Sequence, residues 1–165
     1  MPSITPFLWF DNEAEAAAKF YVSIFKNSRI DDVSYYGEAG PGPSGSVMTV
    51  SFQLDGQDFM AINAPAGSQA GSMPSDDFAQ GKIALYVDCD TQADVDALWD
   101  KLSEGGKKLP CGWVQDKFGF AWNIVPKGLR DVLGGPDEER AERAMQAMLQ
   151  MSKLDIDELR RVYSA

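Results

Sequence analysis

The side chains that could do chemistry are few, because the 165 residues include no histidine. Histidine is the usual metal ligand and general base, so its absence argues against a transition-metal centre and against an imidazole-activated serine or cysteine nucleophile. The two cysteines, Cys89 and Cys111, lack CxxC spacing, which favours reduced thiols in the interior, with a disulfide between them as the alternative. We therefore predict no catalytic thiol, no bound metal and no other cofactor.

Acidic clusters and a glycine-rich stretch are the remaining candidates for binding ions or phosphate. Asp31-Asp32, Asp76-Asp77 and Asp137-Glu138-Glu139 lack the alternating ligand spacing of a calcium loop. The stretch from Gly37 to Ser46 precedes a strand pattern, whereas a phosphate cradle precedes a helix. We interpret the acidic clusters as solvated loops and helix starts, and the glycine-rich stretch as a flexible connection.

The charge balance argues against two classes of partner. A net charge of −10 without a run of Lys and Arg would repel a nucleic-acid backbone. No apolar stretch approaches the ~18 residues that a membrane span requires. The N-terminus has neither the basic flank nor the cleavage site of a signal peptide. We expect a soluble, cytoplasmic protein of one domain.

The elements that would position any site begin with a strand pattern over 3–10. Asn12 and Glu15 predict a capping box at the start of a helix that ends near Lys26-Asn27. Asp55-Gly56 marks a tight hairpin. Three further strands are predicted, at 28–36, 46–54 and 57–63.

The same pattern restarts after a loop over 64–81. A strand over 82–88 and a helix over 91–104 precede strand-like pieces at 107–115 and 118–125. A shift of 77 residues places Asp11 on Asp88, and a shift of 60 places Asn63 on Asn123. This repetition predicts an α+β fold of two β-α-β-β-β modules, at about 3–63 and about 82–125.

The C-terminal extension, about 126–165, is predicted to be helical. Asp137-Glu138-Glu139 opens one helix, and Asp155 with Glu158 opens another. Small and sulfur-containing residues recur at helical spacing along the first: Ala141, Ala144/Met145, Met148 and Met151/Ser152. We interpret this methionine face as core packing, with an adaptable docking face as the alternative.

Several segments, in order, carry a resemblance to one family: Ile4–Phe10, Phe20-Tyr21 with Ile24-Phe25, Gly42–Met48, Cys111–Trp113, Asp116–Gly119 and Trp122. The chain resembles the PhnB-like branch of the vicinal oxygen chelate superfamily, which includes glyoxalase I, bleomycin-resistance proteins and extradiol dioxygenases. This branch also carries the name 3-demethylubiquinone-9 3-methyltransferase. The likeness runs from about residue 3 to 155. It implies two curled mixed sheets that form a cavity, and a homodimer.

In that superfamily the first and last strands of each half supply up to four metal ligands. Carried over to this chain, those positions fall on Thr5, Asn63, Lys82 and Asn123. A lysine and two neutral amides offer neither the negative charge nor the imidazole nitrogen that a divalent transition metal prefers. The resemblance therefore implies a metal site that has been lost.

Three aromatic residues, Phe7, Trp9 and Tyr86, share the strand parity of Thr5 and Lys82 and are expected to wall the same cavity. They could instead fill it as core. Lys82 could hold an anionic ligand or act as a base, or it could reach solvent from a strand start. The two asparagines could bind a ligand or satisfy backbone groups.

These features predict a metal-free small-molecule-binding protein of the glyoxalase or bleomycin-resistance type, with an anionic or aromatic ligand held between two subunits. One alternative is a divergent lyase, isomerase or transferase that uses Lys82 or Tyr86 for proton transfer. Another is a structural or partner subunit with a filled cavity. Methyltransferase activity is not expected, because no glycine-rich turn leads from a parallel strand into a helix.

Overall fold

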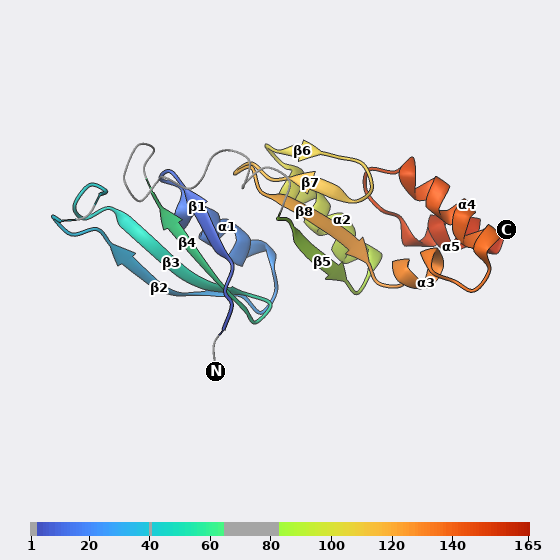
Figure 1. Cartoon of the computed structure of the whole chain (residues 1–165), viewed down its shortest axis with the longest axis horizontal. Helices are drawn as coiled ribbons and strands as arrows, with labels where there is room; N and C mark the ends of the chain where they lie inside the picture. The colour runs from blue at the N-terminus through green and yellow to red at the C-terminus, as the bar shows by residue number, and fades with distance from the viewer. Residues whose placement is uncertain (1–2, 40, 65–82) are drawn as a thin grey trace. The chain divides into compact units, whose positions relative to one another are not determined.

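The computed structural model describes residues 3–39, 41–64 and 83–165 (Figure 1). The chain divides into two compact units, Met1–Phe78 and Ala79–Ala165. Each unit is described by itself. Lys82 and nearly all of the expected loop over 64–81 lie outside the described residues.

The first unit is a four-stranded mixed sheet with one helix (Figure 1). The strands pair in the order β1-β4-β3-β2, with β1 parallel to β4 and the other pairs antiparallel. This β-α-β-β-β order confirms the predicted first module. Its elements are β1 (Phe7–Phe10), α1 (Ala14–Ile24), β2 (Arg29–Tyr35), β3 (Val47–Leu54) and β4 (Gln57–Asn63).

The core of this unit lies between one face of the sheet and α1. Alternate strand residues are buried there, and Phe52 of β3 stacks on Phe59 of β4 with ring centroids 5.5 Å apart. Small residues on α1 let the helix approach the sheet closely. The residues of α1 with no exposed surface are Ala14, Ala17, Ala18 and Tyr21.

The start of α1 differs from the prediction. The residue before the helix is Glu13, whose side chain makes no capping hydrogen bond, so the predicted Asn12–Glu15 box does not form. The helix also ends earlier than predicted, at Ile24, because Phe25 adopts an extended backbone conformation. The predicted Asp55-Gly56 hairpin is confirmed, with positive φ at both residues.

The second unit repeats the arrangement with shorter strands. Its sheet order is β5-β8-β7-β6, again with the first and last strands of the module parallel. Thr91 caps the helix in the usual way, because its side chain accepts a hydrogen bond from the Asp94 N–H group at 3.1 Å. The elements are β5 (Leu85–Cys89), α2 (Gln92–Ser103), β6 (Lys107–Lys108), β7 (Trp113–Gln115) and β8 (Ala121–Pro126).

The turn between β7 and β8 explains one of the sequence motifs. Asp116 is buried, and its Oδ1 atom accepts hydrogen bonds from the backbone N–H groups of Phe118 and Phe120. Its Oδ2 atom accepts a hydrogen bond from the Trp122 indole at 2.8 Å. A carboxylate with three donors is well satisfied when buried. The Asp116–Trp122 motif is therefore a structural device that closes the hairpin.

Three helices complete the second unit: α3 (Leu129–Leu133), α4 (Glu138–Leu149) and α5 (Ile156–Ser164). Asp137 and Asp155 cap α4 and α5 as predicted, whereas the short α3 was not predicted. Met148 and Met151 pack against a buried cluster that includes Ala144 and Leu159. Core packing is thus confirmed for these two methionines.

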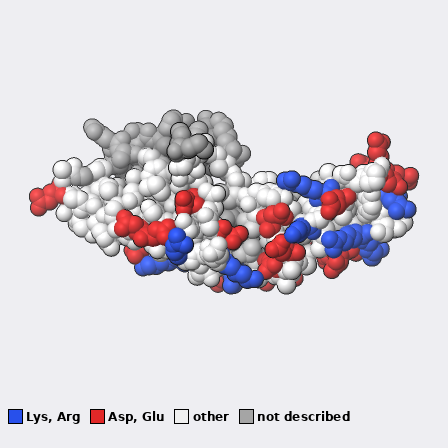
Figure 2. Space-filling view, turned by 90° about the horizontal axis from the view of Figure 1, so that it is seen from below, with Lys and Arg blue, Asp and Glu red and all other residues white. Residues whose placement is uncertain are grey.

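Charged side chains of both signs are interspersed on the face of the molecule shown in Figure 2. Ion pairs such as Arg161–Glu158 at 2.7 Å and Arg140–Asp137 at 3.2 Å join residues one helical turn apart. Exposed pairs of this kind contribute little to stability. Within the described part of the chain, no helix is both long and apolar enough to cross a membrane.

Candidate functional site

The first sheet has an open face, defined here as the face turned away from its helix. Along β1, Leu8 and Phe10 are buried, while Phe7 keeps 44% of its surface exposed and Trp9 is half-buried. The Phe7 and Trp9 rings meet edge to face, with centroids 6.1 Å apart. The expected parity of these two residues is therefore observed. Thr5 is half-buried and precedes the strand.

Neighbouring strands continue this open face. Phe7 pairs with Met60 and Trp9 pairs with Ile62, so the side next to β1 is apolar. Ile62 in turn pairs with Thr49, whose hydroxyl group is hydrogen-bonded to Ser34. The face therefore changes from apolar to hydroxyl-bearing across the sheet.

The second sheet carries three polar or aromatic residues in one line across its open face. Tyr86 of β5 pairs with Asn123 of β8, which pairs with Trp113 of β7. Tyr86 is 53% exposed and Trp113 is 40% exposed. We call these three residues the aromatic row. Two rings that flank an amide can hold a flat ligand by stacking and orient it by a hydrogen bond.

The amide of Asn123 is hydrogen-bonded through its nitrogen atom. Its Nδ2 atom donates to the Cys111 carbonyl at 3.2 Å, which fixes the plane of the amide. Among the described residues, no hydrogen bond is made to its Oδ1 atom. That oxygen can accept a hydrogen bond from a ligand.

Asn63 does not join Phe7 and Trp9. It pairs with Phe10 on the helix-facing side of the sheet and is 7% exposed. Its Oδ1 atom accepts from the Ala14 N–H group at 2.8 Å, and its Nδ2 atom donates to the Val47 carbonyl at 3.1 Å. Of the two alternatives open for Asn63, the structure therefore shows the one in which the amide satisfies backbone groups.

The misplacement of Asn63 comes from a one-residue slip between the halves. Leu8 pairs with Ala61 and Leu85 pairs with Trp122, so the last strands correspond at a shift of 61 rather than 60. Ile62 is then the equivalent of Asn123, and Ile124 is the equivalent of Asn63. A slip of one residue moves a strand side chain to the opposite face of the sheet.

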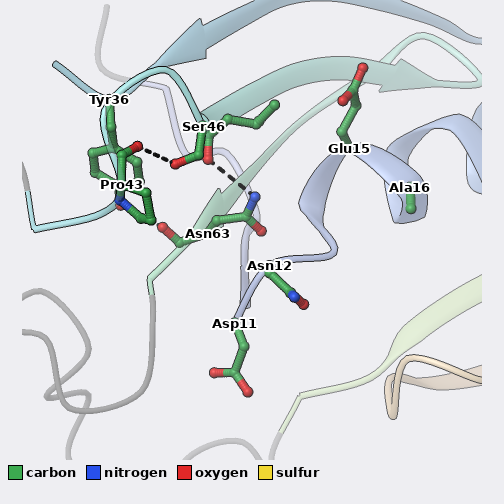
Figure 3. A pocket seen from close by; sticks show the side chains of 9 residues that line it. Asp11, Asn12, Glu15, Ala16, Tyr36, Pro43, Ser46 and Asn63 are labelled. Atoms are coloured by element: carbon green, nitrogen blue, oxygen red, sulfur yellow. Dashed lines mark hydrogen bonds between the residues drawn. The ribbon is translucent and has the colours of Figure 1, made fainter.

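A pocket of about 600 Å³ lies beside the start of α1 (Figure 3). Asp11, Asn12 and Glu15 bound it on the helix side, and Tyr36, Pro43 and Ser46 bound it on the side of the following loop. The remaining lining residues are Ala16, Val47 and Asn63.

Sequence reasoning missed this pocket, because the Gly37–Ser46 stretch was treated only as a flexible connection. The loop is in fact held by the Tyr36 hydroxyl, which donates to the Asn63 carbonyl, and Gly42 lies so close to the Tyr36 ring that a Cβ atom would clash. Glu15 is paired with Lys19 at 2.8 Å. Most of the pocket's lining surface is apolar, Asp11 and Glu15 contribute carboxylates, and the amide of Asn63 is already engaged.

The donors on the open faces do not fit a divalent transition metal. On the last strand of each sheet, the corresponding open-face position holds Ile62 in the first sheet and the neutral Asn123 in the second. The described residues contain no group of three or more Cys, Asp or Glu side chains that could hold a metal ion. These donors therefore do not support metal-dependent chemistry. That the chain binds no metal stays a prediction.

The two thiols differ in their surroundings. Cys89 is buried, and this burial, together with the negative charges of Asp94, Asp88 and Asp90, raises its pKa to about 12. Because the thiolate is the reactive form, Cys89 is unsuited to act as a nucleophile near neutral pH. Cys111 is half-buried, and neither cysteine forms a disulfide.

Comparisons with known proteins give a consistent picture. The family model described as 3-demethylubiquinone-9 3-methyltransferase matches residues 2–125. A PhnB protein from Bacillus cereus, named for the same family, is 34% identical, covers 76% of this chain and 99% of its own, and has a TM-score of 0.63. A search of curated proteins finds no match.

One more distant solved structure shares the fold. A protein from Pseudomonas aeruginosa is 19% identical over 77% of this chain and 100% of its own, with a TM-score of 0.58. A glyoxalase, bleomycin resistance protein or dioxygenase domain from Frankia is 16% identical over 76% of this chain and 97% of its own, with a TM-score of 0.47. The chain belongs to the PhnB-like family that bears the 3-demethylubiquinone-9 3-methyltransferase name.

Proposed function

We propose that this chain is a metal-free small-molecule-binding protein of the glyoxalase and bleomycin-resistance type. The observation that carries the proposal is the aromatic row, in which Tyr86 and Trp113 are about half exposed on either side of Asn123. The solvated face of a sheet is normally polar, and exposed aromatic side chains grouped on it are typical of binding surfaces.

The chemistry of the row defines the ligand class. The faces of Tyr86 and Trp113 favour a planar aromatic group, and the Asn123 Oδ1 atom favours a hydrogen-bond donor on that group. Phe7 and Trp9 offer a second aromatic surface on the first sheet. An anionic ligand remains an expectation tied to Lys82.

The methyltransferase name of the family does not extend to a proposed activity here. The connection from β1 to α1 is Asp11-Asn12-Glu13, and that from β5 to α2 is Asp90-Thr91; neither contains glycine. A cofactor cradle of the common methyltransferase type uses a glycine-rich turn at this place. Proton transfer by Lys82 or Tyr86 and a filled cavity remain the alternatives.

The test is a thermal-shift and native mass-spectrometry screen of the full-length chain against aromatic metabolites, with and without added divalent metals. Trp113→Ala and Tyr86→Ala are expected to weaken binding of a hit by about tenfold, as loss of a stacking partner commonly does. Tyr35→Ala is the matched control, since Tyr35 is an equally exposed tyrosine of the first sheet, at 57%.

Each outcome separates the candidates. Metal-independent binding that is lost in the row variants supports the proposal, and chemical conversion of the hit by the wild-type chain would favour the enzyme. Hits that bind Trp113→Ala and Tyr86→Ala as tightly as wild type would reject the row as the site. We also propose that the chain forms a homodimer, which light scattering would show as twice the mass of one chain.

A further inference from the structure

The turn that leads into Trp113 has an uncommon backbone. Its two central residues, Cys111 and Gly112, have φ angles of 61° and 80°. The Trp113 N–H group closes the turn on the Pro110 carbonyl at 3.2 Å. Glycine adopts positive φ readily, whereas a residue with a side chain, such as Cys111, does so only when its surroundings hold it there.

A segment of the C-terminal extension, Met151–Ile156, supplies those surroundings, and we call it the strap. The N–H groups of Cys111 and Gly112 donate to consecutive strap carbonyls, Met151 at 2.8 Å and Ser152 at 2.7 Å. Leu154 of the strap is 1% exposed, and its Cδ1 atom would lie 2.9 Å from a Cβ atom built on Gly112. The turn and the strap therefore fit together closely.

Helix α2 also contacts the strap, through the side chains of Gln92 and Asp96. The Gln92 Nε2 atom donates to the Leu154 carbonyl at 2.8 Å, and the Gln92 Oε1 atom accepts from the Ile156 N–H group at 3.0 Å. Lys153 pairs with Asp96 of the same helix at 3.0 Å. One glutamine thus binds the strap backbone at two points.

The Pro110–Trp113 turn contacts two members of the aromatic row, because it contains Trp113 and is hydrogen-bonded to Asn123. Trp113 is its last residue, and the Asn123 amide donates to the Cys111 carbonyl at 3.2 Å. The Gly112 carbonyl accepts from the Ile124 N–H group at 2.8 Å, which ties the turn to β8. The strap lies beyond residue 125, where the family model ends.

We propose that the strap, anchored by Gln92, is a positioning element for the aromatic row. It holds the Pro110–Trp113 turn in its positive-φ conformation and thereby sets the direction of the Trp113 indole and the Asn123 amide. Its effect on ligand affinity rests on the proposed function, whereas its effect on Trp113 does not.

The test compares Gln92→Ala with Gln146→Ala in the full-length chain labelled with 5-fluorotryptophan. Gln146 lies on α4, and its Nε2 atom is within 3.4 Å of Glu142 of the same helix, so the control removes an equal side chain without touching the strap. The ¹⁹F signal of Trp113 is assigned with Trp113→Phe. Hydrogen exchange at the Cys111 and Gly112 amides is measured alongside.

Gln92→Ala is expected to shift or broaden the Trp113 signal and to speed exchange at the two amides by about tenfold, because two hydrogen bonds to the strap are lost. The Trp9 signal should not change. A folded Gln92→Ala chain with the same Trp113 signal and the same exchange rates as Gln146→Ala would overturn the proposal.

A second pair of variants covers the case in which Gln92→Ala does not fold. Lys153→Ala removes only the ion pair with Asp96, and Lys19→Ala removes a comparable pair with Glu15 on α1. Lys153→Ala should change the Trp113 signal and the exchange rates in the same direction by a smaller amount. No difference between the two lysine variants would then overturn the proposal.

Binding of 1-anilinonaphthalene-8-sulfonate, followed by its fluorescence, separates this proposal from the proposed function. Gln92→Ala should weaken binding of this aromatic anion about threefold or more relative to Gln146→Ala. A wild-type chain that does not bind it would count against the proposed function alone, since the ¹⁹F and exchange comparison still decides whether the strap positions Trp113.

Discussion

The first backbone N–H groups of α1 and α2 find their hydrogen-bond acceptors in different ways in the two units. In the second unit Thr91 caps α2 locally, and the equivalent of Asn63 on the last strand is the buried, apolar Ile124. In the first unit Glu13 makes no capping bond, and Asn63 reaches from β4 to the Ala14 N–H group. A buried asparagine can thus replace a missing local cap.

The comparison predicts its largest effect at Asn63. Asn63→Ala removes the bond to Ala14 and leaves the Val47 carbonyl without its amide donor, so the free energy of unfolding should fall by about 2–4 kcal/mol. Urea unfolding monitored by circular dichroism measures this loss. A loss well below about 1 kcal/mol would show that water replaces both bonds and that Asn63 is not the cap.

A smaller effect is expected at Thr91. Thr91→Ala removes one local cap from α2, and the usual cost of such a change is about 1 kcal/mol. The same unfolding experiment applies, with Thr49→Ala as a hydroxyl-removing control outside a helix start. If Thr91→Ala cost as much as Asn63→Ala, the contrast between a remote and a local cap would be lost.

The smallest change in stability is expected at Asn123, on the open face. Asn123→Ala removes one hydrogen bond, to the Cys111 carbonyl, from a half-buried position. The free energy of unfolding should therefore fall by no more than about 1 kcal/mol. Affinity for an aromatic ligand of the row should nevertheless fall. If Asn123→Ala lowered the free energy of unfolding as much as Asn63→Ala does, the Asn123 amide would have a structural role like that of Asn63.

Much of the fold could be predicted from the sequence because it follows from local signals. Alternation along 46–54 and the Asp55-Gly56 pair predicted a hairpin that the structure confirms. Asp137 and Asp155 marked the starts of α4 and α5 correctly. The same parity argument predicted that Phe7 and Trp9 share one face of their sheet, as the structure shows, whereas the cavity that these two residues and Tyr86 were expected to wall stays a prediction.

The candidate site could be predicted only in part, because it depends on register between distant strands. Aligning Asn63 with Asn123 matched residue types, but β1 pairs with β4 one residue out of step with that alignment. Trp113 stands out in the sequence only as part of the Cys111–Trp113 segment, because no local pattern indicates that it pairs with Asn123. The role of Gln92 was also hidden, because its partners lie more than sixty residues away.

The most direct measurement of the central claim is a ¹⁹F titration of the 5-fluorotryptophan-labelled chain with an aromatic hit from the screen. Trp113 is 40% exposed on the open face, whereas Trp99 and Trp122 are 3% and 2% exposed in the core. We expect the Trp113 signal to move with ligand concentration in the absence of metal, while the signals of the two core tryptophans stay in place. A saturable hit that leaves the Trp113 signal unmoved, or that binds only when a metal is added, would contradict the account.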